Sequence, residues 1–113
     1  EVRLHILTAT LATPNSPYKD AALYRLHLIR AIEQAFVGFA GEPFCELGRL
    51  GRERSPFPVT MVCCITNGSE GYYPTAEAYD QGGYEPANTR FPKGVGENLT
   101  RGVVDLLHRI HEV

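Results

Sequence analysis

A chain of 113 residues and 12.5 kDa has room for one modest hydrophobic core, so its length predicts a single domain or part of one. With 43% hydrophobic and 21% charged residues it has the composition of a globular protein and not of a disordered one. A formal net charge of −2 and a pI near 6.1 give no reason to expect a nucleic acid as partner. The apolar run at residues 61–65 is too short to cross a bilayer, but peripheral contact of a loop with a membrane stays open.

The N-terminal third predicts three strands, two of them joined in a hairpin. Residues 2–11 alternate apolar and polar side chains before they turn mostly apolar, and residues 12–20, with two prolines, predict a loop. Residues 23–30 alternate again, and residues 35–40 form a short apolar run. The polar residues 33–34 between these segments indicate the turn of a hairpin.

A short helix and a buried strand are predicted next. Residues 43–54 have apolar side chains at helical spacing, and the prolines in residues 55–58 end this helix. Residues 59–66 are apolar almost throughout, as in a central strand covered on both faces. One covered face would carry Val62 and Cys64, and the other Met61, Cys63 and Ile65. Replacing a buried Ile65 by alanine would then cost about 2–5 kcal/mol.

Four of the six tyrosines lie in residues 71–85, among glycines, a proline and acidic residues. Within this segment Thr75 can cap a single helical turn that runs through Tyr79, and the glycines at 82 and 83 can end it. Tyrosines in such a turn-rich setting can direct their hydroxyls into a cleft.

The chain closes with a predicted amphipathic helix over residues 96–112. Its buried stripe consists of Leu99, Val103, Leu106, Leu107 and Ile110. The elements together predict an α/β fold: a mixed β-sheet with a hairpin, a central buried strand and a C-terminal amphipathic helix.

Cysteine and serine chemistry have little support. Cys45, Cys63 and Cys64 have no spacing typical of a zinc site, so we expect them to be small buried hydrophobic side chains. No serine has the neighbours that would predict a Ser-His-Asp triad within this chain.

Glu42 is the first candidate functional residue. It follows the apolar run at residues 35–40, and ligand sites of α/β proteins favour the ends of buried strands, where a carboxylate can bind a metal or accept a proton. The alternative is a structural acid near the positive end of the predicted helix at residues 43–54.

Tyr72 and Tyr84 are the second and third candidates, 84 − 72 = 12 residues apart. A tyrosine hydroxyl can ligate zinc once the metal lowers its pKa, or donate a hydrogen bond to a developing oxyanion. The alternative is that both rings are ordinary half-buried aromatics with their hydroxyls in water.

Residues 71–85 resemble a segment of the neutral/alkaline (non-lysosomal) ceramidases, which in many bacterial members reads Gly-Tyr-x-Pro-Thr-x-Glu-x-Tyr-x-x-Gly-Gly-Tyr-Glu. The resemblance runs from about residue 23 to residue 110, and three shorter matches support it: Gly41-Glu42-Pro43-Phe44, Thr66-Asn67-Gly68 and Gly94-Val95-Gly96-Glu97. It implies that residues 1–113 are the C-terminal part of a ceramidase-like catalytic domain, a fragment of a larger unit. It also implies a secreted or extracytoplasmic protein.

The same resemblance implies roles for the three candidates. Glu42 and Tyr72 match the zinc ligands that the family draws from this part of its chain, and Tyr84 matches the tyrosine that assists the scissile amide. The implied activity is zinc-dependent hydrolysis of the N-acyl amide of ceramide or a related lipid, in which zinc activates water and polarises the carbonyl.

One departure from the family is large. Its other two zinc ligands are histidines from upstream segments, and neither these nor the serine-bearing segment has a counterpart here. His5 and His27 do not stand in matching motifs. We therefore expect the remainder of the catalytic domain or a partner chain to complete the site, and this chain alone to be inactive. The alternative is a non-catalytic binding or assembly module that retains the ceramidase-like fold.

Overall fold

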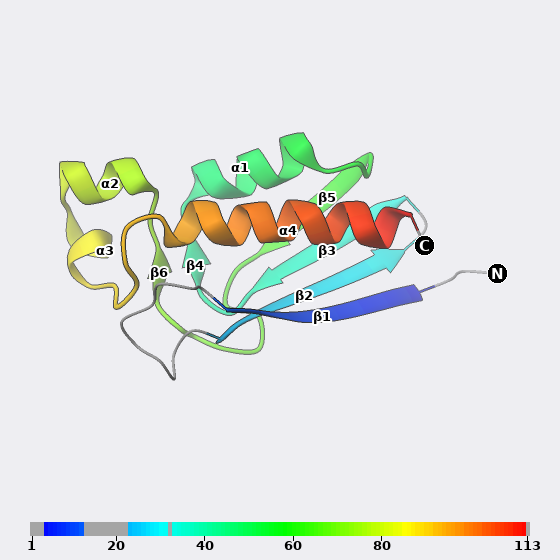
Figure 1. Cartoon of the computed structure of the whole chain (residues 1–113), viewed down its shortest axis with the longest axis horizontal. Helices are drawn as coiled ribbons and strands as arrows, with labels where there is room; N and C mark the ends of the chain where they lie inside the picture. Colours follow the sequence, from blue (N-terminus) through cyan, green and yellow to red (C-terminus); the bar gives the residue numbers. More distant parts are fainter. Residues whose placement is uncertain (1–3, 13–22, 32, 113) are drawn as a thin grey trace.

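The main sheet has four strands, and two long helices lie over one of its faces (Figure 1). The computed structural model describes residues 4–12, 23–31 and 33–112. Along the chain the elements are β1 (Leu4–Ala12), β2 (Leu23–Ala31), β3 (Gln34–Phe39), β4 (Glu42–Pro43), α1 (Cys45–Arg54), β5 (Val59–Cys63), β6 (Tyr72–Tyr73), α2 (Ala76–Gln81), α3 (Tyr84–Ala87) and α4 (Val95–His111). The expected α/β fold is confirmed.

The four strands lie in the order β1-β2-β3-β5. The predicted hairpin is confirmed as β2 and β3, which pair antiparallel with Leu28 opposite Val37. β5 pairs parallel to β3, and α1 lies in the crossover that such a pair requires. The loop predicted at residues 12–20 falls, after its first residue, outside the described residues.

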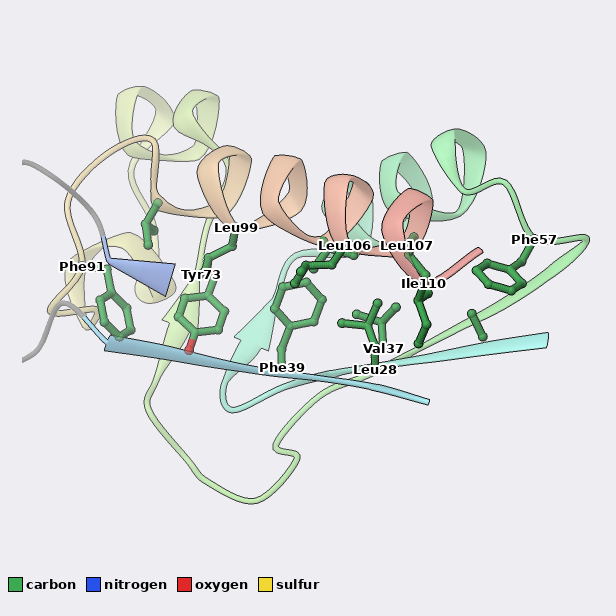
Figure 2. Close-up of a cluster of buried hydrophobic side chains, with 13 residues drawn as sticks. Leu28, Val37, Phe39, Phe57, Tyr73, Phe91, Leu99, Leu106, Leu107 and Ile110 are labelled. Carbon is green, nitrogen blue, oxygen red and sulfur yellow. The ribbon is translucent and has the colours of Figure 1, made fainter. Parts of the chain in front are cut away.

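The hydrophobic core lies between the sheet and α4, as Figure 2 shows. Leu28, Val37 and Phe39 point from the strands toward the helix. All five residues of the predicted apolar stripe on α4 are buried: Leu99, Val103, Leu106, Leu107 and Ile110. The sequence prediction of this helix is therefore confirmed, both in its bounds to within one residue and in its buried face.

The prediction of a central strand at residues 59–66 is wrong. β5 ends at Cys63 and has only β3 as a partner in the described part of the sheet, so it lies at an edge (Figure 1). Val62 packs against the core, but Met61 is 51% exposed and Ile65 50% exposed. An apolar run indicates that a strand is suited to burial, whereas the number of its neighbours is decided by the rest of the fold.

The cysteines also differ from expectation, because all three are free and exposed. Cys45 begins α1, where its thiol donates to the Glu46 carboxylate at 3.3 Å. Cys63 is the last residue of β5 and lies on the same face of the strand as Met61. Cys64 lies in the bend that follows β5. Of the helices that the structure describes, none is both long and apolar enough to span a membrane.

Candidate functional site

A second, two-stranded sheet brings the first two candidate residues together. β4 and β6 pair parallel, and the register places Glu42 opposite Tyr72 and Pro43 opposite Tyr73. Side chains of directly paired residues project to the same side of a sheet. Glu42 and Tyr72 are 72 − 42 = 30 residues apart in the sequence. They are neighbours in the structure because β6 runs alongside β4, which follows directly after β3.

Gly41 permits this return. A Cβ atom at Gly41 would lie 2.5 Å from the Gly71 carbonyl oxygen and 2.7 Å from the Tyr73 ring, which is closer than real Cβ atoms approach. The strands meet through hydrogen bonds from the Glu42 amide to the Gly71 carbonyl at 2.9 Å and from the Phe44 amide to the Tyr73 carbonyl at 3.1 Å. The glycine of the Gly-Glu pair is thus required by the close approach of two backbones.

We expect Gly41→Ala to lower the free energy of unfolding by about 1–3 kcal/mol, because the new methyl must displace backbone or the buried Tyr73 ring. Urea-induced unfolding measures this loss. Gly51→Ala is the matched control, since Gly51 lies in α1 with nothing within 4 Å of an added Cβ. It should stabilise the helix by about 0.5–1 kcal/mol. Equal effects of the two substitutions would contradict the close approach at Gly41.

Tyr84 joins the pair from the start of α3. Its ring meets the Tyr72 ring edge to face, with centroids 6.0 Å apart. The turn into α3 passes through Gly82 and Gly83, whose φ angles of 79° and 124° are typical of glycine. Tyr84 is 65% exposed, so its hydroxyl can reach a molecule bound at the surface. The structure therefore brings all three candidate residues together.

Three hydrogen bonds hold the first half of the tyrosine segment in place. The predicted cap is confirmed: the Thr75 hydroxyl accepts the Ala78 amide at 3.3 Å at the start of α2. The Thr89 hydroxyl donates to the Tyr72 carbonyl at 2.7 Å and so fixes the backbone of the candidate ligand itself. Glu97, on the first turn of α4, accepts the Ala76 amide through Oε1 at 2.6 Å.

Thr89 and Glu97 were not identified as candidates from the sequence. A carboxylate in the first turn of a helix is common for electrostatic reasons, so the position of Glu97 does not single it out in the sequence. In the structure its second oxygen, Oε2, is buried without a hydrogen-bond partner. Such an atom normally requires a donor, and here it lies beside the segment that carries the candidate residues.

The charge of Glu42 and the pKa of Tyr72 determine how well this pair of residues could bind a metal ion. Desolvation, the Glu42 carboxylate, Tyr84 and Glu85 raise the pKa of the Tyr72 phenol above its ordinary value. The phenol is therefore protonated at neutral pH, as a hydrogen-bond donor. A cation beside it would reverse this preference and would also neutralise the Glu42 charge, so this pair of oxygen donors fits a metal ion.

The donor set is nevertheless incomplete in the part of the chain described. No three His, Cys, Asp or Glu side chains among residues 4–12, 23–31 and 33–112 are grouped to hold a metal ion. Glu42 and Tyr72 supply two oxygen donors, whereas zinc sites use three or four protein ligands. His108 and His111, both exposed, lie on the last turns of α4, where His111 packs edge to face on Phe57.

Comparison with known proteins finds a similar fold within a longer chain. No model of a known protein family matches the sequence, and no curated protein sequence matches it significantly. A solved structure described as "Ceramidase complexed with C2" is similar in fold, with a TM-score of 0.71 over 87% of this chain at 15% sequence identity. This chain spans 17% of the length of that ceramidase chain. At this identity the likeness establishes a shared fold.

Proposed function

We propose that this chain is part of a zinc-dependent amidohydrolase of the neutral ceramidase type. The single observation that carries the proposal is the register of β4 and β6, which pairs Glu42 with Tyr72, while the Tyr84 ring meets the same tyrosine edge to face. The ceramidase-like fold and the resemblance of residues 71–85 support the same function. The substrate would be ceramide or a related N-acyl lipid.

In this proposal Glu42 and Tyr72 hold the metal. Zinc would activate water and polarise the amide carbonyl when bound. Glu42 would contribute a charged oxygen whose field the ion neutralises. Tyr72 would contribute a phenolic oxygen whose ionisation the cation favours, against the raised pKa that the protein alone imposes.

Tyr84 would act on the substrate and not on the metal. Its exposed hydroxyl can donate a hydrogen bond to the amide oxygen as negative charge develops there. The ring contact with Tyr72 orients the Tyr84 phenol next to the metal ligands without using its hydroxyl. The remaining metal ligands would come from the rest of the longer catalytic domain or from a partner chain. Because the substrate would be a lipid, the proposal also includes peripheral contact of the protein with a membrane.

Zinc titration by calorimetry tests this function. The 113-residue chain should bind zinc weakly, and the longer protein that carries it should bind tightly, because two ligands do not make a zinc site. In the longer protein Glu42→Gln should weaken zinc binding on the order of 10-fold or more, since it removes a charged ligand.

Glu77→Gln is the matched control for the zinc titration. Glu77 is exposed on α2, and its carboxylate contacts Gln81 of the same helix at 2.9 Å. The control should bind zinc as the unchanged protein does. Weak zinc binding by the longer protein, or equal binding by both variants, would contradict the metal assignment and favour a non-catalytic assembly module.

A further inference from the structure

The side of β5 that faces away from the helices is apolar and uncovered. Among the described residues four large hydrophobic side chains are exposed, and three of them lie on β5 or just after it: Val59 (43%), Met61 (51%) and Ile65 (50%). Cys63 is exposed on the same side, and Phe36 of β3, half-buried, is the register partner of Met61. We call these five residues the β5 surface.

Among the described residues, no strand pairs with the outer edge of β5. β3 pairs with one edge of β5, and no hydrogen bond of the described residues joins the other edge to a further strand. Natural edge strands are normally protected by a charged side chain, a proline or a bulge. The sequence of β5, Val-Thr-Met-Val-Cys, has no charge and no proline, and its register with β3 is unbroken.

The residue that extends the β5 surface is held in an unfavourable backbone conformation. Ile65 has φ = 50°, a left-handed value that is rare for a β-branched residue. Hydrogen bonds hold this turn in place, from the Ile65 amide to the Gly41 carbonyl at 3.0 Å and from the Thr66 amide to the Phe39 carbonyl at 2.7 Å. The turn thus presents an apolar side chain outward at a cost in backbone energy.

We propose that the outer edge of β5 pairs with a further β-strand, supplied by the longer polypeptide of which this fold is a part. An added strand would satisfy the free N–H and C=O groups of β5 and cover Val59, Met61 and Ile65. A membrane surface would cover the apolar side chains but would leave the backbone groups without partners, which favours a strand. β5 would then be central, as its composition indicates.

The source of the strand follows from the size of the related fold. This chain spans 17% of the ceramidase chain that it resembles, so a protein of that kind has ample polypeptide to supply a neighbour. The inference rests on the proposed function only in taking this chain as part of a larger domain. The strand pairing requires neither zinc nor hydrolysis. The pairing can therefore be absent while the proposed function holds, and it can be present while the proposed function is wrong.

Amide hydrogen exchange on the protein purified from its own source tests the pairing. In a free edge strand alternate amides have no partner, so every second amide of residues 59–63 would exchange as in an unfolded chain. We expect all five amides of β5 (Val59–Cys63) to be slowed instead, on the order of 100-fold or more. Amides of α4, bonded within the helix, are the internal reference.

Two substitutions in the same protein sharpen the result. Met61→Lys places a charge in the β5 surface and should raise exchange at the outward β5 amides on the order of 100-fold. His108→Lys adds a similar charge at an exposed position of α4 and should leave β5 exchange unchanged.

Light scattering coupled to size-exclusion chromatography identifies the source of the strand. We expect the mass of a single copy of the purified protein, together with slow amide exchange in β5. Alternating fast and slow amides in the native protein would overturn the proposal. Slow exchange with a mass of two copies would also overturn it, because the occupant would then be a second copy of this chain.

Discussion

If the proposed function holds, Tyr84→Phe in the longer protein is expected to leave zinc bound and to slow amide cleavage by roughly 10²–10³-fold. The substitution removes one hydroxyl and keeps the ring, so the edge-to-face contact with Tyr72 remains. Only the proposed hydrogen bond to a developing oxyanion would be lost. Turnover of an N-acylsphingosine, measured beside metal content by elemental analysis, separates this effect from a loss of metal.

Two further tyrosine variants control the Tyr84 experiment. Tyr72→Phe should lower zinc occupancy, because it removes a proposed ligand oxygen. Tyr79→Phe should preserve zinc and turnover and lower the free energy of unfolding by about 1 kcal/mol, because the Tyr79 hydroxyl donates to the Phe91 carbonyl at 2.7 Å. Full zinc and full activity in both Tyr72→Phe and Tyr84→Phe would make these tyrosines structural, and the proposed function would then rest on fold similarity alone.

Leu107→Ala is expected to cost about 2–5 kcal/mol of unfolding free energy, the largest effect on stability that we predict. Leu107 is fully buried in the core between α4 and the sheet, where a truncated side chain leaves a cavity (Figure 2). Urea-induced unfolding followed by circular dichroism gives the difference.

Ile65→Ala is the matched comparison, because it also removes an aliphatic side chain. In the isolated 113-residue chain Ile65 is half exposed and has a positive φ that alanine adopts with less strain than a β-branched residue, so the loss there should stay below about 0.5 kcal/mol. This reverses the expectation from sequence, in which Ile65 was buried. A loss at Ile65 as large as that at Leu107 in the isolated chain would contradict the exposed position of Ile65.

Features that depend on neighbours in the sequence were predicted well. The hairpin of β2 and β3 follows from alternation interrupted by a polar pair, and the Thr75 cap follows from the chemistry of a helix start. The buried stripe of α4 follows from a period that the helix itself imposes. In each case the residues that interact lie within a few turns or strands of one another.

Features that depend on the number of neighbours in space were predicted poorly. β5 was assigned a central position because it is apolar, yet it has one partner strand in the described fold. The cysteines were assigned to the interior on the average behaviour of the residue type, and all three are exposed. The composition of a segment indicates whether it can be buried. Whether it is buried depends on which other elements pack against it.

The candidate site lies between these two cases. The chemistry of Glu42, Tyr72 and Tyr84 taken alone left structural alternatives open, and the resemblance of residues 71–85 selected the functional ones. The roles of these residues stay predictions, as do the zinc ion, the substrate and the extracytoplasmic location. Thr89 and Glu97 were missed, because a hydroxyl and a carboxylate that hold another segment have no local signature.

The sequence by itself determined the longer helices and strands of this protein, since helix and strand periodicity, caps and turns act over short separations in the chain. Only the tertiary structure decided that Glu42 faces Tyr72, because a parallel pair of two-residue strands has no local pattern and exists only where the backbone passes Gly41 at close range. It also decided that β5 lies at an edge. Both outcomes depend on contacts between residues distant in the sequence, whose free energy is set by packing and backbone pairing and not by local propensity.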